Sequence, residues 1–391
     1  MTPADAALRS RLRATLEQAV AEGVTPGAVC EVTARGLPTV SVTAGHLASH
    51  DDAGALIPAQ SRTSVTPDTI YDLASVSKLF TSLTLLSLAD DGVVDLDASV
   101  GEWLPAFRLK PRSAESTSDA PKSAVTLAHL LSHTSGLPPV HPRTLQHSVH
   151  GFGGDRPRWV APNRAELLDD ILTLPLERPA GTDKVYSCLG YITSMAVAEA
   201  ATGMPWTQIV RERVLVPLGL DRTTFAPDPS LTAPTEFQPQ LGRGMVQGIV
   251  HDETACALGG PAGNAGLFAP AADLTSLGSA LVAGLPDLLS PESSALLWED
   301  QLPRLLGARA TAVESSLGYG QSLGLRIGQR SWMSEGGGRA RGHTGFVGTS
   351  LLVDRERELV VVLLTNRVHP DRSLTDATTL RNAISALAYD R

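Results

Sequence analysis

A serine and a lysine three residues apart are the first pair of side chains in this sequence that could do chemistry. They lie in the tetrad Ser75-Val76-Ser77-Lys78, at the start of a segment that is apolar nearly all round. Residues three apart on a helix share a face, so Lys78 is expected one turn behind Ser75, where its amine could take the hydroxyl proton. The amine must first lose its own proton, which burial would favour. A chance match on a solvated helix is the alternative for so short a tetrad.

Two further motifs follow along the chain in a specific order. Tyr186-Ser187-Cys188 precedes a predicted helix, and His343-Thr344-Gly345 precedes a predicted strand. Taken alone, Tyr186 is more simply a packed or capping aromatic. As an ordered set, the motifs resemble those of the serine beta-lactamase and penicillin-binding-protein superfamily, closest to its class C and family VIII esterase branch. That superfamily orders S-x-x-K, then Y-x-N, then K-T-G or H-T-G, and stretches such as YDLASVSKLFTSL and LAHLLSHTSGLP carry the same resemblance.

This resemblance extends from about residue 25 to the C-terminus and implies a role for each motif. Ser75 would be the acylated nucleophile, Lys78 its partner, and Tyr186 a second base. The segment His343-Thr344-Gly345 would lie on the sheet edge beside the site. The oxyanion hole would use the backbone N–H groups of Ser75 and Phe346. A tyrosine with its ordinary pKa of about 10 is protonated at pH 7, so Lys78 and His343 are expected to stabilise the phenolate or share its proton.

Two departures from the superfamily pattern bear on the substrate. Cys188 stands where asparagine is usual, so the amide that contacts acyl-amide side chains is absent, and poor turnover of beta-lactams is expected. A nucleophilic role for Cys188 is the alternative, but Ser75 already fills that role. His343 replaces the usual lysine, and a largely neutral imidazole should bind a substrate carboxylate weakly. Arg341 would share a strand face with His343 and could restore the charge; a solvated loop arginine is the alternative.

Strands are predicted at both ends of the chain and helices in the middle. Residues 27–33 and 39–46 have the composition of strands, and 346–353 and 359–365 flank a polar turn as an antiparallel hairpin. The continuous apolar run of the last strand indicates a sheet covered on both faces. Apolar periodicity predicts a first helix that ends before Gly23 and further helices over 73–90, 126–133, 164–173, 187–202 and 206–215 and from about 375. Irregular connections are predicted at 111–124, 138–163 and 226–245.

These elements predict an α+β fold with two parts. A sheet domain would comprise residues 1–80 and 245–391, and a mostly helical domain, residues 81–244, would be inserted between them. Together with the motifs, this is the beta-lactamase/transpeptidase-like arrangement of an antiparallel sheet flanked by helices.

Composition and charge exclude several classes of protein. Lys+Arg 32 against Asp+Glu 41 gives a net charge of −9, which argues against a nucleic-acid or anionic-membrane surface. The three cysteines lie far apart without a C-x-x-C pair, and HLLSH lacks the glutamate of a zinc-protease helix, so no disulfide framework, metal or other cofactor is predicted. The N-terminal residues lack an apolar signal region and the longest apolar run is too short to span a membrane, so a cytoplasmic protein is expected.

The sequence therefore predicts a metal-independent serine hydrolase that forms an acyl-enzyme on Ser75. Small carboxylic esters or amides are the leading substrates, followed by D-amino-acid peptides and beta-lactams. An acyltransferase of the same fold, which passes the acyl group to an alcohol or amine, is the nearest alternative. A ligand sensor that binds without turnover is a third. The expected partners are a small acyl substrate and an acyl acceptor, with the oligomeric state left open.

Overall fold

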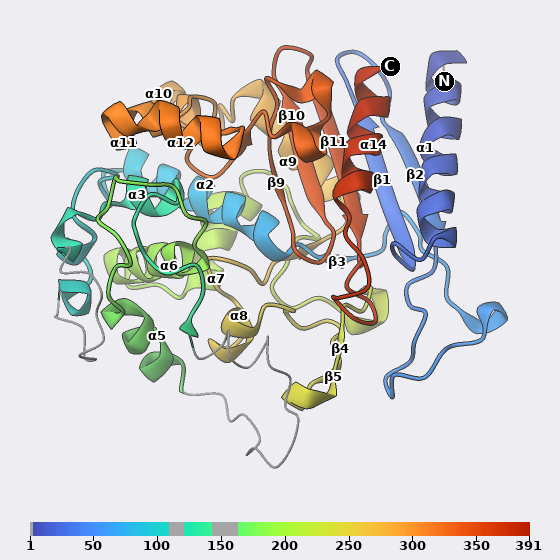
Figure 1. Cartoon of the computed structure of the whole chain (residues 1–391), viewed down its shortest axis with the longest axis horizontal. Helices are drawn as coiled ribbons and strands as arrows, with labels where there is room; N and C mark the ends of the chain where they lie inside the picture. The colour runs from blue at the N-terminus through green and yellow to red at the C-terminus, as the bar shows by residue number, and fades with distance from the viewer. Residues whose placement is uncertain (1–2, 109–120, 143–162) are drawn as a thin grey trace.

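A computed structural model describes residues 3–108, 121–142 and 163–391 of the chain. Most of the irregular segments predicted at 111–124 and 138–163 lies outside this described part. The described ends meet on one side of the molecule, where the first and last helices run side by side (Figure 1). Within these residues, no helix combines the length and the apolar character that crossing a membrane requires.

A seven-stranded antiparallel sheet forms one side of the molecule (Figure 1). The strand order is β2-β1-β11-β10-β9-β8-β7, so strands from the beginning of the chain pair with strands from its end. The bounds are β1 (Gly27–Thr33), β2 (Val40–Gly45), β7 (Gly320–Gln321), β8 (Arg326–Ile327), β9 (Arg341–Thr344), β10 (Ser350–Asp354) and β11 (Leu359–Thr365). The predicted antiparallel sheet flanked by helices is confirmed.

The interior strand β11, which lies between β1 and β10, is buried along its whole length because helices cover both faces of the sheet. Its odd-numbered residues from 359 to 363 pack in the core formed with α1 (Pro3–Ala21) and α14 (Thr378–Tyr389). Its even-numbered residues from 360 to 364 pack in the core that includes α9 (Ala271–Ala283). Gly278 permits this close approach, since a Cβ there would lie 2.4 Å from Val360 Cγ1. The continuous apolar pattern thus predicted the covering correctly.

Helices fill the other side of the molecule (Figure 1). The helix α2 (Ser77–Asp90) has 12 of its 14 residues buried, in agreement with its apolar sequence, and packs against α6 (Cys188–Thr202). The remaining helices are α3 (Leu127–Leu131), α5 (Arg164–Thr173), α7 (Trp206–Val210), α8 (Glu253–Ala257), α10 (Pro291–Ala295), α11 (Leu302–Leu306), α12 (Ala310–Leu317) and α13 (Arg330–Met333). Two small two-stranded sheets pair β3 (Tyr71–Asp72) with β6 (Phe268–Ala269) and β4 (Phe237–Gln238) with β5 (Gly244–Met245). The proposed domain boundaries at 81 and 244 stay a prediction.

The structure differs from the predicted elements mainly near the motifs. The helix predicted over 126–133 ends at Leu131, and His133 has a φ of 63°, which an α-helix does not accommodate. The strand predicted from residue 346 begins only at Ser350, because a tight turn that includes Gly348 (φ of 121°) precedes it. The helix predicted over 206–215 is α-helical to Val210 and continues as a π turn. Strands β7, β8 and β9 were not predicted, since runs of two to four residues carry no clear alternation.

Candidate active site

The turn that carries Ser75 is held from both sides by hydrogen bonds. A short 3₁₀ turn over Ala74–Val76 leads into α2, and Ala74 has a φ of 46°, a strained value for a residue with a Cβ. The buried carboxylate of Asp72 accepts the Ala74 N–H at 2.7 Å and the His251 N–H at 2.8 Å. Two backbone contacts thus fix the carboxylate, which in turn fixes the turn. Ser75 therefore lies in a turn that several contacts hold in place, and it lines a cavity.

Lys78 lies one turn after Ser75 and has no solvent exposure. Its Nζ lies 3.0 Å from Ser75 Oγ, 3.0 Å from the Asn264 carbonyl oxygen and 3.5 Å from Cys188 Sγ. The ammonium can donate to all three atoms at once, which compensates its burial without a carboxylate partner in these hydrogen bonds. The spacing of the S-x-x-K tetrad therefore brings the two side chains into contact.

Tyr186 lies against the same lysine, just before α6 begins. Lys78 Nζ is 5.0 Å from the centroid of the Tyr186 ring, and the His133 ring packs against that ring in a tilted orientation at a centroid distance of 4.4 Å. The Ser187 backbone N–H donates to His133 Nδ1 at 3.1 Å, and its hydroxyl caps α6 by accepting the Gly190 N–H. The helix cap and the hydrogen bond to His133 together fix the backbone next to Tyr186, and so the position of its side chain. The fold thus brings Tyr186, from a distant segment, to the amine that contacts the Ser75 hydroxyl.

Burial dominates the protonation of this cluster. It raises the pKa of the Tyr186 phenol above its ordinary value, although the charge of Lys78, a hydrogen bond with it and the charge of Arg326 lower that pKa in part. Burial raises the pKa of the Cys188 thiol as well. Burial alone would lower the pKa of Lys78, but the anionic forms of Cys188 and Tyr186 outweigh it and leave the lysine pKa above its ordinary value. At neutral pH the resting cluster holds an ammonium beside a neutral phenol and a neutral thiol.

The turn between β9 and β10 is fastened directly to the Ser75 turn. Thr349 Oγ1 donates to the Leu73 carbonyl at 3.1 Å. Gly345 leaves room for this contact, since a Cβ there would lie 2.1 Å from Thr349 Oγ1 and 2.6 Å from the Leu73 carbonyl oxygen. Within the described residues, the backbone N–H groups of Ser75 and Phe346 have no hydrogen-bond acceptor. The N–H groups of Ser75 and Phe346, on these two connected turns, are therefore available to donate to a substrate oxygen.

His343 lies beside this turn but is withdrawn from the cavity. It is buried in β9, with Nδ1 2.9 Å from the Thr344 carbonyl oxygen and its ring centroid 6.1 Å from that of Tyr186. Burial and the charges of Arg326 and Lys78 hold the pKa of His343 well below its ordinary value. A neutral imidazole with Nδ1–H bound to a carbonyl exposes only an acceptor at Nε2. His343 therefore supplies no positive charge for a substrate.

The cation expected from Arg341 comes from a different residue. The Arg341 guanidinium donates to the Trp298 carbonyl, with Nε at 2.9 Å, and lies over the Trp298 ring, and it is not among the described residues that line the cavity. Arg326 of β8 lines the cavity instead. Its guanidinium carbon lies 5.4 Å from the Tyr186 ring centroid, and Nη1 donates to Thr344 Oγ1 at 3.2 Å. Arg341, which the sequence offered as a source of this charge, is thus held against Trp298 instead.

A single cavity of about 620 Å³ opens over these groups. Ser75, Tyr186 and Cys188 line one end of it, together with Thr344, Gly345 and Phe346. This volume is typical of small-molecule sites. Lys78 lies beneath its floor, in contact with Ser75. The cavity can therefore hold a small substrate whose carbonyl carbon meets the Ser75 hydroxyl.

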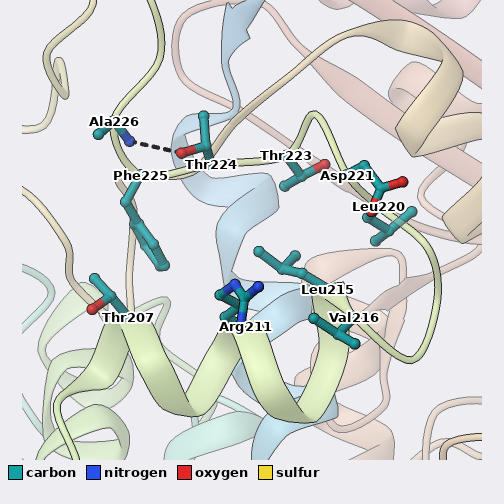
Figure 2. Close-up of a pocket in the computed structure, with 10 residues that line it drawn as sticks. All are labelled: Thr207, Arg211, Leu215, Val216, Leu220, Asp221, Thr223, Thr224, Phe225 and Ala226. Carbon is teal, nitrogen blue, oxygen red and sulfur yellow. Dashed lines mark hydrogen bonds between the residues drawn. The ribbon is translucent and has the colours of Figure 1, made fainter.

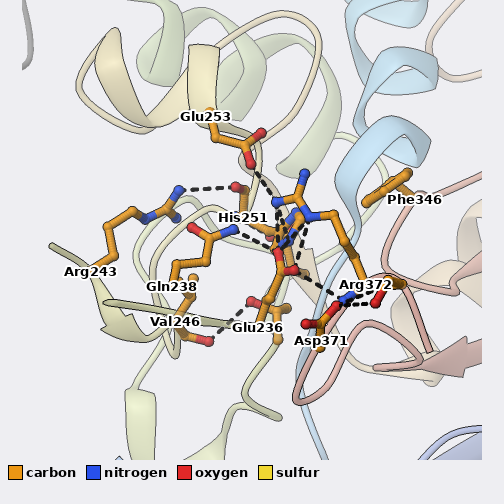
Figure 3. A network of polar contacts seen from close by, with 12 residues as sticks. Glu236, Gln238, Arg243, Val246, His251, Glu253, Phe346, Asp371 and Arg372 are labelled. Atoms are coloured by element: carbon orange, nitrogen blue, oxygen red, sulfur yellow. Dashed lines mark hydrogen bonds and ion pairs between the residues drawn. The ribbon is translucent and has the colours of Figure 1, made fainter. Parts of the chain in front are cut away.

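An ionic network (Figure 3) contributes His251, Glu253 and Arg372 to the lining of the cavity. Glu236 lies at its centre, where Oε2 is 2.8 Å from His251 Nε2, and Arg372 Nε donates to both carboxylate oxygens at 2.9 and 2.7 Å. Arg372 also pairs with Glu253. Burial would raise the pKa of Glu236, but hydrogen bonds from His251 and Arg372 hold it well below its ordinary value. The half-exposed Phe346 ring stacks on the His251 ring at 5.8 Å, so this network supports the Phe346 side of the cavity.

A second cavity of about 410 Å³ lies away from this cluster (Figure 2). The π turn after α7 forms one wall and the segment from Leu220 to Ala226 the other, with Arg211 and Phe225 facing the opening. None of Ser75, Lys78 and Tyr186 lines it. In the described part of the chain no three His, Cys, Asp or Glu side chains converge as metal ligands would.

Sequence reasoning missed His133 and Arg326, which both contact Tyr186. His133 belongs to HLLSH, and nothing in that segment indicates the left-handed backbone at His133 or its contact with Tyr186. Arg326 lies in a two-residue strand that no periodicity reveals. The sequence indicates only that a basic residue precedes the H-T-G motif. Arg326 and Arg341 both meet this description, so the sequence does not distinguish them.

Comparison with known proteins shows the family to which the sequence belongs. The model of a family described as Beta-lactamase matches residues 12–386. A protein of Escherichia coli K12 provisionally named D-alanyl-D-alanine carboxypeptidase is 28% identical over 328 residues, which cover 78% of this chain and 70% of that protein.

Solved structures share the fold at lower sequence identity. EstCE1, titled a hydrolase with promiscuous acyltransferase activity, has a TM-score of 0.74 and 22% identity over 99% of this chain and 100% of its own. A mutant of simvastatin synthase (LovD) from Aspergillus terreus has a TM-score of 0.71 and 21% identity over 97% of this chain and 94% of its own.

Proposed function

This chain belongs to the Beta-lactamase family and has a serine beta-lactamase fold, and from that premise we propose that it hydrolyses small carboxylic esters or amides through an acyl-enzyme on Ser75. The observation that carries the proposal is the contact of 3.0 Å between Lys78 Nζ and Ser75 Oγ at the floor of the cavity. Tyr186 borders the same point, which gives the nucleophile two neighbouring groups that exchange protons.

Acylation follows from the placement of these groups. Ser75 Oγ attacks the substrate carbonyl carbon while its proton passes to the Lys78–Tyr186 pair, once that pair has lost a proton. As negative charge develops on the carbonyl oxygen, the N–H groups of Ser75 and Phe346 donate hydrogen bonds to it. When the carbon–oxygen bond to the leaving group breaks, the pair returns the proton to the departing alkoxide. Ser75 is then an ester of the acyl group.

Deacylation reverses the proton path with a new nucleophile. Water attacks the acyl carbonyl, its proton passes to the Lys78–Tyr186 pair, and Ser75 recovers a proton as the ester bond breaks. An alcohol or amine in place of water would give acyl transfer. The cavity volume of about 620 Å³ supports this second candidate, because it leaves room for an acceptor beside an acetyl or butyryl group. EstCE1, which shares the fold, has a title that names promiscuous acyltransferase activity, and another protein of this fold is titled simvastatin synthase.

A direct test uses p-nitrophenyl acetate and butyrate, with and without an added alcohol or amine. Steady p-nitrophenol release, together with free acid as the product, supports hydrolysis. Transfer product that grows with acceptor concentration favours the acyltransferase. A single stoichiometric burst, or no release at all, contradicts both and favours a ligand sensor. A chromogenic cephalosporin, offered as a comparison, should be a poor substrate because Cys188 provides no amide for its acyl side chain.

We expect kcat/KM to rise with pH from 7 to 10 without reaching a plateau. The active form of the Lys78–Tyr186 pair has lost one proton, and both pKa values lie above their ordinary positions near 10. Rising pH therefore increases the active fraction throughout this range, by up to about tenfold per pH unit. Initial rates with a p-nitrophenyl ester, measured across this range, check the profile. A plateau that begins near pH 7 would contradict this protonation scheme.

Arg326 and Arg341 provide a matched pair for the same measurement. The charge of Arg326 lowers the pKa of Tyr186, so Arg326→Gln should raise that pKa and move the profile to higher pH. Arg341→Gln removes an equal charge held against Trp298 and should leave the profile in place. Equal profiles for both variants would show that Arg326 does not act on the phenol.

A further inference from the structure

Arg381 of α14 is a buried arginine bound to the turn between β9 and β10. Its side chain is almost enclosed, and Nη2 donates to the Gly345 carbonyl at 2.8 Å and to the Thr349 carbonyl at 3.1 Å. Within the described residues these are its hydrogen bonds, and no carboxylate accepts from it. Asp376 acts on it only through its charge. A guanidinium in this position is unusual, since buried charges are normally paired.

The burial of Arg381 has a cost that packing alone does not explain. Burial lowers the pKa of Arg381 to about 10, and its Nε has no hydrogen-bond partner in the described chain. Burying a charge without a carboxylate is unfavourable, and an apolar side chain of similar volume would fill the space more stably. The two carbonyls that it binds belong to the turn that carries Phe346. The charged guanidinium of Arg381 therefore acts on this turn, through its hydrogen bonds to the two carbonyls.

The Gly345 carbonyl and the Phe346 N–H belong to one peptide group. This bond is not among the cis peptides of the structure, so its C=O and N–H point in opposite directions. Because Arg381 binds the carbonyl, the N–H points away from Arg381, and no acceptor in the described residues takes it. A cation on the carbonyl oxygen also draws electron density from the amide, which makes the N–H a stronger donor.

We propose that Arg381 is a positioning residue of the oxyanion hole, which fixes the plane of the Gly345–Phe346 peptide and polarises its N–H toward the substrate oxygen. The inference rests on the proposed acyl-enzyme function and deepens it. Arg381 also lines the cavity, but its hydrogen bonds go to the Gly345 and Thr349 carbonyls and none goes to Ser75. It acts through the peptide, so its contribution should grow as negative charge develops on the carbonyl oxygen.

Arg367 follows β11, lines the cavity and contacts the same turn, so it provides a control. Its Nε donates to the Phe346 carbonyl at 3.0 Å, which belongs to the next peptide, whose N–H is that of Val347. Arg367 therefore orders the turn without polarising the Phe346 N–H. A second control lies far from the cavity, where the buried Arg391 pairs with Asp5 at 2.7 Å. Loss of Arg391 reports the effect of removing a buried arginine on stability alone.

The experiment measures steady-state hydrolysis of p-nitrophenyl acetate by Arg381→Gln, Arg381→Met and Arg381→Lys in the full chain. Loss of an oxyanion donor costs about 100- to 1,000-fold in kcat, and Arg381 acts one bond removed from the donor, so we expect kcat to fall about 10- to 30-fold with KM nearly unchanged. Arg381→Lys keeps a charged donor and should recover most of the rate. Arg381→Met is included because an apolar replacement of a buried charge commonly folds well.

A spectroscopic measurement distinguishes polarisation of the Phe346 N–H from mere ordering of the turn between β9 and β10. Acylation with p-nitrophenyl trimethylacetate carrying a ¹³C-labelled carbonyl gives an acyl-enzyme whose C=O stretch falls as its oxygen accepts stronger hydrogen bonds. Arg381→Gln and Arg381→Met should move this band back toward that of the free ester, while Arg367→Gln and Arg391→Gln should leave it near its wild-type position.

The outcomes test the role of Arg381 separately from the proposed acyl-enzyme function. An unchanged band and kcat in Arg381→Met overturn the inference but leave the acyl-enzyme proposal standing. A slower variant with an unmoved band also overturns it, since Arg381 would then only support the fold. If the wild-type chain releases no p-nitrophenol and forms no acyl-enzyme, the proposed function fails and the inference fails with it.

Discussion

Ser75→Ala is expected to lower ester turnover by about 10⁴-fold or more and to abolish the covalent intermediate. The hydroxyl at 3.0 Å from Lys78 Nζ is the only atom that the mechanism acylates, so its loss removes the step rather than slowing it. Mass spectrometry after reaction with a fluorophosphonate checks this directly. The wild-type chain should gain one phosphonyl group on the peptide that contains residue 75, and the variant none.

Ser77→Ala is the matched control for this substitution. Ser77 belongs to the same tetrad, but its hydroxyl accepts the Leu267 N–H at 3.2 Å and is buried. We expect a stability loss of about 1 kcal/mol with turnover close to wild type. If Ser77→Ala were the inactive variant and Ser75→Ala the active one, the assignment of the nucleophile would be wrong.

Tyr186→Phe is expected to lower kcat by about 10²- to 10⁴-fold with a small change in KM. The ring and its packing against His133 remain, but the Lys78–Tyr186 pair loses its phenol and with it the relay to the leaving group. The alkaline rise of kcat/KM should also change, because Lys78 then titrates without a phenolate beside it. Steady-state kinetics from pH 7 to 10 measure both effects.

Tyr191→Phe tests whether any buried tyrosine near Lys78 would behave in this way. The Tyr191 ring centroid lies 5.6 Å from Lys78 Nζ, but its hydroxyl donates to the Leu131 carbonyl at 2.7 Å. Loss of that hydrogen bond should cost about 1 kcal/mol of stability and leave the rate within a few-fold of wild type. Equal losses in the two variants would remove Tyr186 from the proton path.

The sequence predicted those parts of the molecule that local spacing determines. The apolar run of β11 required a covered strand, and the i, i+3 spacing of Ser75 and Lys78 required contact on one helix face. The ordered motifs indicated the family. Each of these inferences depends on residues that are neighbours in the chain or on a pattern long enough to be read.

The rest of the site could not be predicted because it depends on tertiary contacts. Arg326 and Arg341 lie in adjacent short strands, and only the pairing of Ile327 with Arg341 decides which guanidinium reaches Tyr186. Likewise, the pKa of Lys78 depends on Cys188, the first residue of α6, and on Tyr186, which lies just before that helix. No spacing in the sequence encodes such contacts.

The hydrogen bond between Thr349 and Leu73 joins two residues that are 276 positions apart. During synthesis the nucleophile therefore leaves the ribosome long before the strand that must complete its oxyanion hole. Contacts of such high sequence separation form slowly, since the intervening chain must first be ordered. Catalytic competence is thus a late event in the maturation of this protein, and recovery of activity after dilution from denaturant reports closure of the whole sheet rather than formation of the helix that carries the serine.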